Sequence, residues 1–251
     1  MAIVIAFSSL KGGVGKSTLS LNVAACLHRA GHRTLIVDAD PQGTCAAWAS
    51  RAAELEHDGP PVVAMTGASL RRDLAKVAEG FDVVVLDSPP RMNLEARAAM
   101  LAADLVVVPV TPGAADMWAA ASTVAVLEDA RGLRPELRAA LLMNRADRTT
   151  VAKLASKALE ELGLPVLDVS VSSRVAFGEA TLAGQGVVDY APSSDAAREI
   201  RRLTRTILDA MGSNAIATDL RVQCARDRRS LSDAVTAAVT MWLQTQGTKG
   251  T

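Results

Sequence analysis

Short apolar runs rich in β-branched residues alternate along this chain with longer segments in which apolar residues recur at helical spacing. Runs such as Val83–Leu86 and Val106–Val108 are apolar at every position, as strands buried on both faces of a parallel sheet require. This alternation predicts an α/β fold, a doubly wound and mostly parallel sheet flanked by helices with right-handed crossovers. The expected strands are Ile3–Phe7, Thr34–Val37, Pro61–Met65, Phe81–Leu86, Leu105–Val110, Leu137–Met143 and, more weakly, Pro165–Val171.

One boundary divides the 251 residues. After Met211, the sequence of residues 212–215 (GSNA) reads as a helix stop followed by a connector. With 49% hydrophobic and 22% charged residues, the chain has enough apolar surface for a packed core. We therefore expect one domain over residues 1–212 and a helical extension over residues 213–251, which packs on the core or binds a partner.

The charges sum to zero, with 27 basic and 27 acidic residues. Residues 213–251 hold five basic and three acidic groups, so the extension carries +2 and the rest −2. A sum of zero therefore hides an uneven distribution and does not exclude a local basic surface. The N-terminus lacks a basic leader, no apolar run reaches the length of a membrane span, and the three cysteines show no ligand spacing. These features predict a reduced cytoplasmic protein without a membrane segment.

A glycine-rich segment, KGGVGKST, lies between the first expected strand and the helical segment Leu19–Ala30. Its spacing varies from the general phosphate-loop pattern, in which the earlier glycine would fall at Leu10. Backbone amides of such a loop surround a phosphate, Lys16 neutralises its oxygens, and the hydroxyl of Ser17 is offered to Mg²⁺. A plain strand-to-helix connection is the alternative. The expected nucleotide-binding residues are Lys11, Gly12, Gly13, Val14, Gly15, Lys16, Ser17 and Thr18.

Acidic residues follow two of the expected strands. The second strand ends in Asp38 and Asp40, within DADPQG, and the fourth ends in Asp87, within DSPP. Carboxylates two residues apart are expected to point the same way, toward the edge where a doubly wound sheet binds its ligand. One would hold Mg²⁺ through water while the other orients the attacking water, and Asp87 would contact Mg²⁺ or its water shell. A solvated Asp-Pro turn is the competing interpretation.

The string KGGVGKST, with its additional lysine at Lys11, resembles the deviant Walker A motif of the ParA/MinD ATPases. The two acidic strings resemble the DxDPQ and DxPP motifs of the same family. The resemblance implies that Lys11 reaches the nucleotide of a partner in an ATP-sandwich dimer, and that Asp40 carries hydrolysis. The expected catalytic residues are therefore Lys11, Lys16 and Asp40. The expected metal-binding residues are Ser17, Asp40 and Asp87, and the expected cofactors are ATP and Mg²⁺.

Asn144 closes the sixth expected strand, and its amide offers a donor and an acceptor that suit the edge of adenine. A turn-forming asparagine is the alternative. The resemblance supports a base contact and covers residues 1–211, including Asp104–Pro112 and Arg174–Ser194. It is strongest to short ParA proteins that lack an N-terminal helix-turn-helix domain.

The expected helix Ala196–Met211 carries arginines at positions i, i+3, i+4 and i+7, so they share one face. Apolar residues such as Ile200 and Leu203 occupy the opposite face. A solvated charged face is the simpler interpretation, but the resemblance implies non-specific DNA binding that depends on ATP and on salt. The candidate DNA-binding residues are Arg198, Arg201, Arg202 and Arg205.

The extension holds two helical candidates, a basic one over Asp219–Arg229 and an amphipathic one that begins at Ser230. The second has no lysine or arginine on its polar face between Ser230 and Gln244, which makes it a poor membrane helix.

Together, the resemblance implies a ParA-type ATPase of the cytoplasm and nucleoid. It would pair in the presence of ATP, bind DNA and hydrolyse ATP slowly until a ParB-like protein or cargo adaptor stimulates it. The cargo would be a plasmid, a chromosome or a protein assembly. The alternative is a metabolic enzyme that binds ATP with the same kind of phosphate loop, such as an ATP-dependent amide synthase, whose substrates would be an organic acid and ammonia or glutamine.

Overall fold

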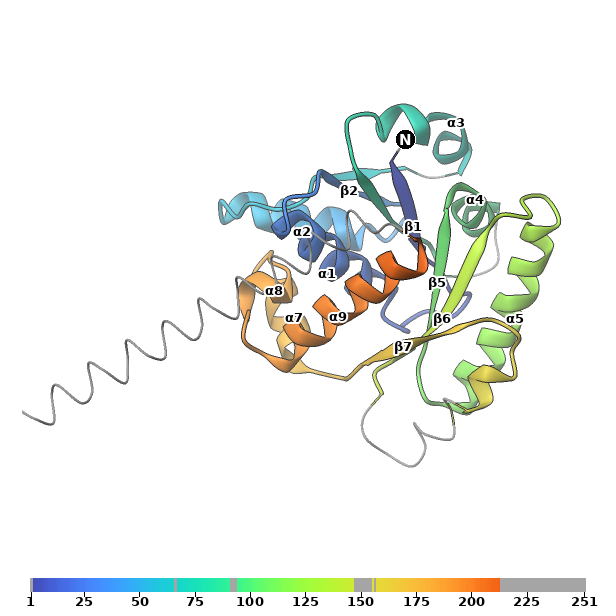
Figure 1. Ribbon diagram of the computed structural model, residues 1–251. Coiled ribbons are helices and arrows are strands. Elements are labelled where there is room, and N and C mark those ends of the chain that lie inside the picture. Colours follow the sequence, from blue (N-terminus) through green and yellow to red (C-terminus); the bar gives the residue numbers. More distant parts are fainter. Residues whose placement is uncertain (1, 66, 91–93, 147–154, 156, 213–251) are drawn as a thin grey trace, which may run out of the picture.

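The structure is a computed structural model that describes residues 2–65, 67–90, 94–146, 155 and 157–212 (Figure 1). Its seven strands form a single sheet in the order β3-β2-β4-β1-β5-β6-β7, and every neighbouring pair is parallel. The expected doubly wound sheet is confirmed, and it is parallel throughout. The strands are β1 (Ile3–Phe7), β2 (Thr34–Asp38), β3 (Val62–Ala64), β4 (Val83–Asp87), β5 (Leu105–Val110), β6 (Arg138–Asn144) and β7 (Val166–Val171).

Helices cover both faces of the sheet (Figure 1). One layer contains α1 (Lys16–Arg29), α2 (Thr44–Glu54), α7 (Val175–Leu182), α8 (Val187–Tyr190) and α9 (Asp195–Ala210). The other layer contains α3 (Gly67–Val77), α4 (Leu94–Ala102) and α5 (Ala114–Arg131).

Strand β4 illustrates why the sheet needs apolar residues at every position. Val83 and Val85 pack into the layer of α1 and α9, whereas Val84 and Leu86 pack into the layer of α3, α4 and α5. Successive side chains of a strand point to opposite faces, so a strand between two helical layers has no solvent-facing side. All four of these side chains are fully buried.

Three element boundaries differ from the expected ones in a way that matters for the site. Strands β2 and β4 each run one residue further, so Asp38 and Asp87 are themselves the last strand residues. Helix α1 begins at Lys16, which places the end of the glycine-rich loop in its first turn. Ser194 is the N-cap of α9, where its hydroxyl accepts a hydrogen bond from the Ala197 amide at 3.2 Å.

Two expectations fall partly or wholly on residues that the structure does not describe. The extension over residues 213–251, with both of its helical candidates, lies outside the described residues. The sequence before β7 also predicts a helix that begins near Thr150 and ends at Gly163, and the structure describes this segment only at residue 155 and from residue 157 onward, where 157–160 are helical.

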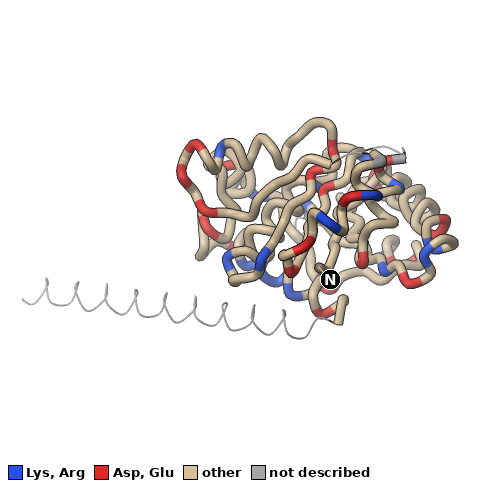
Figure 2. Tube along the Cα trace, turned by 90° about the horizontal axis from the view of Figure 1, so that it is seen from above, with Lys and Arg blue, Asp and Glu red and all other residues tan. Residues whose placement is uncertain are grey.

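Over the described residues, basic and acidic positions are mostly interspersed, although several basic positions lie close together at one side of the molecule (Figure 2). Many of them form ion pairs within the described part, such as Arg33 with Asp82 and Arg174 with Glu199. Over the same residues, none of the helices combines the length and the apolar character that crossing a membrane requires.

Candidate functional site

The expected site residues meet at the carboxyl edge of the sheet, where β1, β4 and β2 end side by side. Phe7 pairs with Asp87, and Asp87 pairs with Asp38, so the three strand ends are level. The glycine-rich loop follows Phe7 directly and leads into α1. Ligands of doubly wound sheets bind outside this edge, close to the helix that follows the first strand.

The loop is shaped by a glycine and by a side chain from a distant strand. Gly15 is the N-cap of α1 with φ of 93°, a conformation that residues with a side chain rarely adopt. The Asn144 amide at the end of β6 donates a hydrogen bond of 2.7 Å to the Val14 carbonyl, and a Cβ at residue 15 would collide with that amide. The buried Asn144 therefore holds the loop, and its expected contact with a base stays a prediction.

Lys16 lies inside this loop and is only 6% exposed. Its ammonium donates a hydrogen bond of 3.0 Å to the Lys11 carbonyl, so the side chain folds back over the turn. Burial lowers the pKa of Lys16, while the nearby carboxylates of Asp87 and Asp40 act in the opposite direction. A cation enclosed among loop amides at a helix N-terminus is the arrangement that phosphate oxygens require.

Lys11 has different surroundings. Its ammonium forms an ion pair with Asp116 in the first turn of α5, and its side chain is 36% exposed. The neighbouring Leu10 amide donates a hydrogen bond of 3.3 Å to the hydroxyl of Thr123, also on α5. The start of the loop is therefore attached to α5, whereas Lys16 is enclosed by the loop itself.

Asp38, Cys45 and Asp87 form a buried cluster whose candidate ligand atoms lie within 4.8 Å of one another. One carboxylate oxygen of Asp38 accepts hydrogen bonds from the Cys45 and Ala46 amides in the first turn of α2, at 2.9 and 3.0 Å. Asp87 accepts from the Ser20 hydroxyl at 3.3 Å and from the Cys45 thiol at 3.5 Å. Asp38 therefore anchors α2 against the strand edge.

Asp40 is not one of these three residues but is joined to them, because its amide donates a hydrogen bond of 3.2 Å to the Asp38 carboxylate. Its carboxylate accepts a hydrogen bond of 3.0 Å from the Gln42 amide within its own turn, and it is half-buried. Asp38 is almost fully buried, so the two carboxylates differ in exposure, and the expectation that they point the same way stays a prediction. The role of Asp40 in hydrolysis and metal binding stays a prediction.

Sequence reasoning weighed Asp38 with Asp40 as a pair of strand-end carboxylates but assigned the metal-binding and hydrolytic roles to Asp40, and it did not select Cys45. Asp38 carried a signal, because it ends an otherwise apolar strand and is buried there. Cys45 carried none, since its position depends on the packing of α2 against the edge.

The donors at this edge fit a magnesium-bound nucleotide. The Ser17 hydroxyl is close enough to Asp87 to lower the pKa of that carboxyl, so a hydroxyl and a carboxylate lie near one another, and Mg²⁺ prefers oxygen ligands. The hydroxyls of Ser8 and Ser88, which follow β1 and β4, are buried without a hydrogen-bond partner among the described residues. Burial raises the pKa of the Cys45 thiol, so this sulfur stays protonated and acts as a donor to Asp87.

Burial raises the pKa of Asp87 to about 7, an effect that the nearby Ser17 hydroxyl and Cys45 thiol only partly offset. The folded, magnesium-free protein then binds more protons than the unfolded chain between about pH 4 and 7, where each pH unit costs up to about 1.4 kcal/mol of stability. We expect Asp87→Asn to be more stable than the wild type at pH 8 without nucleotide or Mg²⁺, with the difference shrinking toward pH 5. Urea unfolding of both proteins between pH 5 and 8 measures this difference in the free energy of unfolding.

Asp73→Asn is the matched control for this prediction, because Asp73 forms an exposed ion pair with Arg72 on α3. Its substitution is expected to change stability by less than about 1 kcal/mol at any pH. A loss of stability in Asp87→Asn that is the same at every pH would show that the Asp87 carboxylate is not destabilised by its burial.

The four candidate DNA-binding arginines lie on one face of α9, opposite the buried Ile200, Leu203 and Ile207. Arg198 pairs with Asp195, and Arg202 binds the carbonyl and carboxylate of Asp168 at 2.7 and 3.3 Å. Arg201 donates to the Pro192 carbonyl at 2.8 Å, and Arg205 is half-buried. Two of the arginines are thus partly neutralised by carboxylates of their own chain, and DNA binding by this face stays a prediction.

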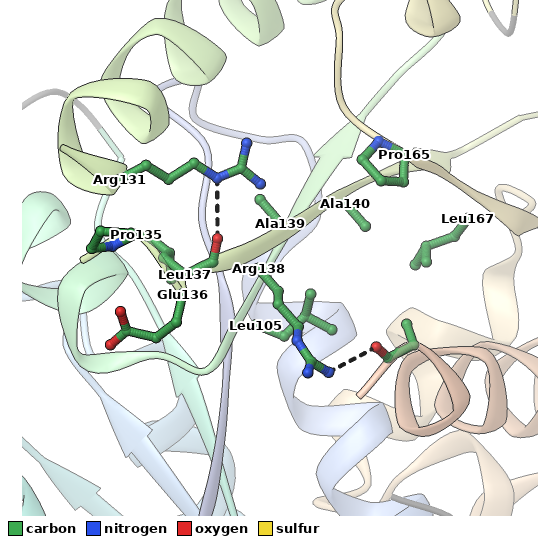
Figure 3. Close-up of a pocket in the computed structure, with 11 residues that line it drawn as sticks. Leu105, Arg131, Pro135, Glu136, Leu137, Arg138, Ala139, Ala140, Pro165 and Leu167 are labelled. Atoms are coloured by element: carbon green, nitrogen blue, oxygen red, sulfur yellow. Dashed lines mark hydrogen bonds between the residues drawn. The ribbon is translucent and has the colours of Figure 1, made fainter. Parts of the chain in front are cut away.

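A hollow of about 510 Å³ lies at the other edge of the sheet, where β5 and β6 begin (Figure 3). Its lining includes Leu105, Leu137 and the end of α9. Arg131 donates to the Leu137 carbonyl at 3.1 Å, and Arg138 donates to the Ala210 carbonyl at 3.2 Å (Figure 3). This hollow is at the amino ends of the strands, away from the phosphate loop, and is not part of the candidate site.

Comparison with known proteins agrees with this geometry. Residues 5–187 match the CbiA family, described as the CobQ/CobB/MinD/ParA nucleotide binding domain. The chain belongs to this family. A relative from Halothiobacillus neapolitanus, maintenance of carboxysome distribution protein A, is 32% identical over 82% of this chain and 97% of its own length. The chromosome-partitioning ATPase Soj of Thermus thermophilus is 34% identical over 81% of this chain and 94% of its own.

The fold is also that of a solved MinD. The septum site-determining protein MinD of Pyrococcus horikoshii, in complex with Mg-ADP, superposes with a TM-score of 0.65 at 20% identity, over 82% of this chain and 96% of its own. The expected cofactors, ATP and Mg²⁺, agree with these findings, since the Thermus thermophilus relative is named an ATPase and the Pyrococcus horikoshii structure contains Mg-ADP. The resemblance to ParA and MinD proteins is confirmed.

Proposed function

We propose that this member of the ParA and MinD family is a positioning ATPase. With ATP and Mg²⁺ bound, two copies pair across their phosphate loops, the pair binds DNA without sequence preference, and a ParB-like or cargo-adaptor protein stimulates slow hydrolysis. The observation that carries the proposal is the contrast between the two loop lysines. Lys16 is enclosed by its own loop, whereas the ammonium of Lys11 lies outside it, beside α5. A lysine placed in this way can reach a nucleotide in a facing copy once its ion pair with Asp116 is broken.

In this proposal, different residues of the chain would bind the phosphates, hold Mg²⁺ and orient the attacking water. Loop amides and Lys16 hold the phosphates, Ser17 and Asp87 hold Mg²⁺, and Asp40 orients the attacking water. Mg²⁺ supplies neutralisation of the charge that develops on the phosphate oxygens. Asp38 binds the first turn of α2 and pairs in register with Asp87. A shift of Asp87 on metal binding would therefore also move the start of α2.

The names of the relatives suggest two classes of cargo. One is named for carboxysome distribution and the other for chromosome partitioning. Within this proposal the protein works in the cytoplasm, on the nucleoid, and moves either a protein assembly or a DNA molecule. Capture of neighbouring-gene products by the Asp40→Ala variant with ATP would identify the adaptor.

The proposal is tested by the oligomeric state with ATP. The wild type with a non-hydrolysable ATP analogue and Mg²⁺ is expected to sediment as a dimer, and as a monomer with ADP. Lys11→Ala is expected to bind the analogue and remain a monomer. A wild type that stays monomeric with saturating analogue would contradict the sandwich dimer. ATP turnover without an organic acid, ammonia or glutamine would separate this function from an amide synthase.

DNA binding has its own test on α9. Arg198→Ala combined with Arg202→Ala is expected to weaken binding of random duplex DNA at least about 10-fold with the ATP analogue, because both side chains are exposed cations. The slope of log affinity against log salt should become shallower by about 1 for each phosphate that the variant no longer neutralises. Fluorescence anisotropy over a salt series measures both quantities. Arg72→Ala on α3 is the control, and an unchanged affinity in the double variant would remove this face from the proposal.

A further inference from the structure

The ion pair between Lys11 and Asp116 joins the phosphate loop to α5 within one chain. Asp116 lies in the first turn of α5, where its amide donates a hydrogen bond of 3.0 Å to the Gly113 carbonyl. Its side chain is 15% exposed, so the carboxylate is largely covered. The positive end of the helix dipole favours a negative charge at this place, with or without a lysine beside it.

Residue 11 is held at two points. Its side chain is bound by Asp116, and its carbonyl accepts the hydrogen bond from the Lys16 ammonium. Phosphates bound in the loop would draw the Lys16 ammonium toward themselves, which would remove the second restraint. The ion pair with Asp116 would then be what keeps the Lys11 side chain on its own protomer.

We propose that Asp116 is a positioning residue that retains Lys11 in its own protomer and competes for it with the nucleotide phosphates of a facing protomer. This inference rests on the proposed pairing through Lys11. Pairing must break the ion pair with Asp116 in both copies, so it occurs only when the phosphates opposite bind Lys11 more strongly. Asp116 thereby raises the nucleotide and protein concentrations at which the dimer forms and disfavours pairing with ADP.

The size of the effect follows from the exposure of the pair. A partly exposed ion pair changes an equilibrium by up to about fivefold. A symmetric dimer breaks two such pairs, so the dimerisation constant of Asp116→Asn is expected to rise by up to about 25-fold. Asparagine keeps the shape of the side chain and removes its charge.

The experiment compares four full-length variants by sedimentation velocity with a non-hydrolysable ATP analogue and Mg²⁺. Asp116→Asn is expected to form dimers at several-fold lower protein concentration than the wild type. Asp116→Glu, which keeps the carboxylate, should restore the wild-type threshold. Asp129→Asn, an exposed carboxylate on the same helix, should leave the threshold unchanged. Lys11→Ala is expected to remain a monomer.

A second readout separates positioning from a general effect on folding. In the nucleotide-free monomer, an acylating reagent followed by mass spectrometry should label Lys11 several-fold faster in Asp116→Asn than in the wild type or in Asp129→Asn. An unchanged threshold and labelling rate in Asp116→Asn, with Lys11→Ala monomeric, would overturn the inference and leave the sandwich dimer intact. A weaker dimer in Asp116→Asn would also overturn it. A wild type that does not dimerise would instead overturn the proposed pairing itself.

Discussion

Replacing Lys16 with alanine is expected to reduce ATP hydrolysis by about 100- to 1,000-fold and to weaken ATP binding strongly, because a preorganised cation in a water-poor loop is removed. The ammonium is buried and has the Lys11 carbonyl as its hydrogen-bond acceptor, so neighbouring side chains cannot replace it without moving. Isothermal titration with Mg-ATP and a phosphate-release assay measure the two effects.

The fold should tolerate this change. Burial lowers the pKa of Lys16, which means that the folded state carries this charge at a cost. The Lys16→Ala variant is therefore expected to unfold at a denaturant concentration close to that of the wild type. Lys76→Ala, at an exposed position of α3, is the control and should bind and hydrolyse ATP normally. Retention of ATP affinity within about threefold in Lys16→Ala would contradict the assignment of this loop to the phosphates.

Replacing Asp40 with alanine is expected to slow hydrolysis by about 100- to 1,000-fold while ATP binding is retained. Asp40 is half-buried and its carboxylate binds the Gln42 amide of its own turn, so its removal leaves the strand edge intact. Its carboxylate is close enough to raise the pKa of Lys16, which places it at the loop that would hold the phosphates. Single-turnover hydrolysis and equilibrium ATP binding, measured on the same preparation, separate the two steps.

Asp38→Ala is the informative comparison for this prediction. Its carboxylate holds the first amides of α2 and pairs in register with Asp87, so its removal should weaken both stability and magnesium-dependent binding. Removal of a buried charged acceptor of this kind costs about 1 to 3 kcal/mol. If Asp38→Ala arrested hydrolysis with binding and stability unchanged, and Asp40→Ala turned over normally, the roles of the two aspartates would be exchanged.

Much of the fold was predictable because burial on both faces leaves a simple signature in the sequence. The apolar runs at Val83–Leu86 and Leu105–Val110 coincide with strands, since few other structures bury every residue of such a run. The edge strand β3 is shorter than the expected Pro61–Met65, and two of its three residues are exposed. A strand with one neighbour is less constrained by the pattern.

The part of the site that could be predicted consists of residues at or just after the ends of strands, whose positions follow from the order of the strands. The loop follows β1, Asp40 lies two residues after β2 and Asp87 ends β4, so their meeting at one edge follows from the topology. The partners of Lys11 and Asn144 were not predictable in this way. Asp116 and Val14 are brought to them by the packing of α5 and β6 around the loop, and no spacing in the sequence encodes that packing.

The hydrogen bond from Asn144 to the Val14 carbonyl has a consequence for how the protein is made. The loop motif has been translated by residue 18, but the side chain that fixes its shape is 130 residues further along than Val14. A ribosome-bound or proteolysed chain that stops before β6 would contain the complete loop motif but lack the Asn144 side chain that hydrogen-bonds to it. The loop geometry seen in the folded protein is therefore completed only after the chain has been synthesised through the sixth strand.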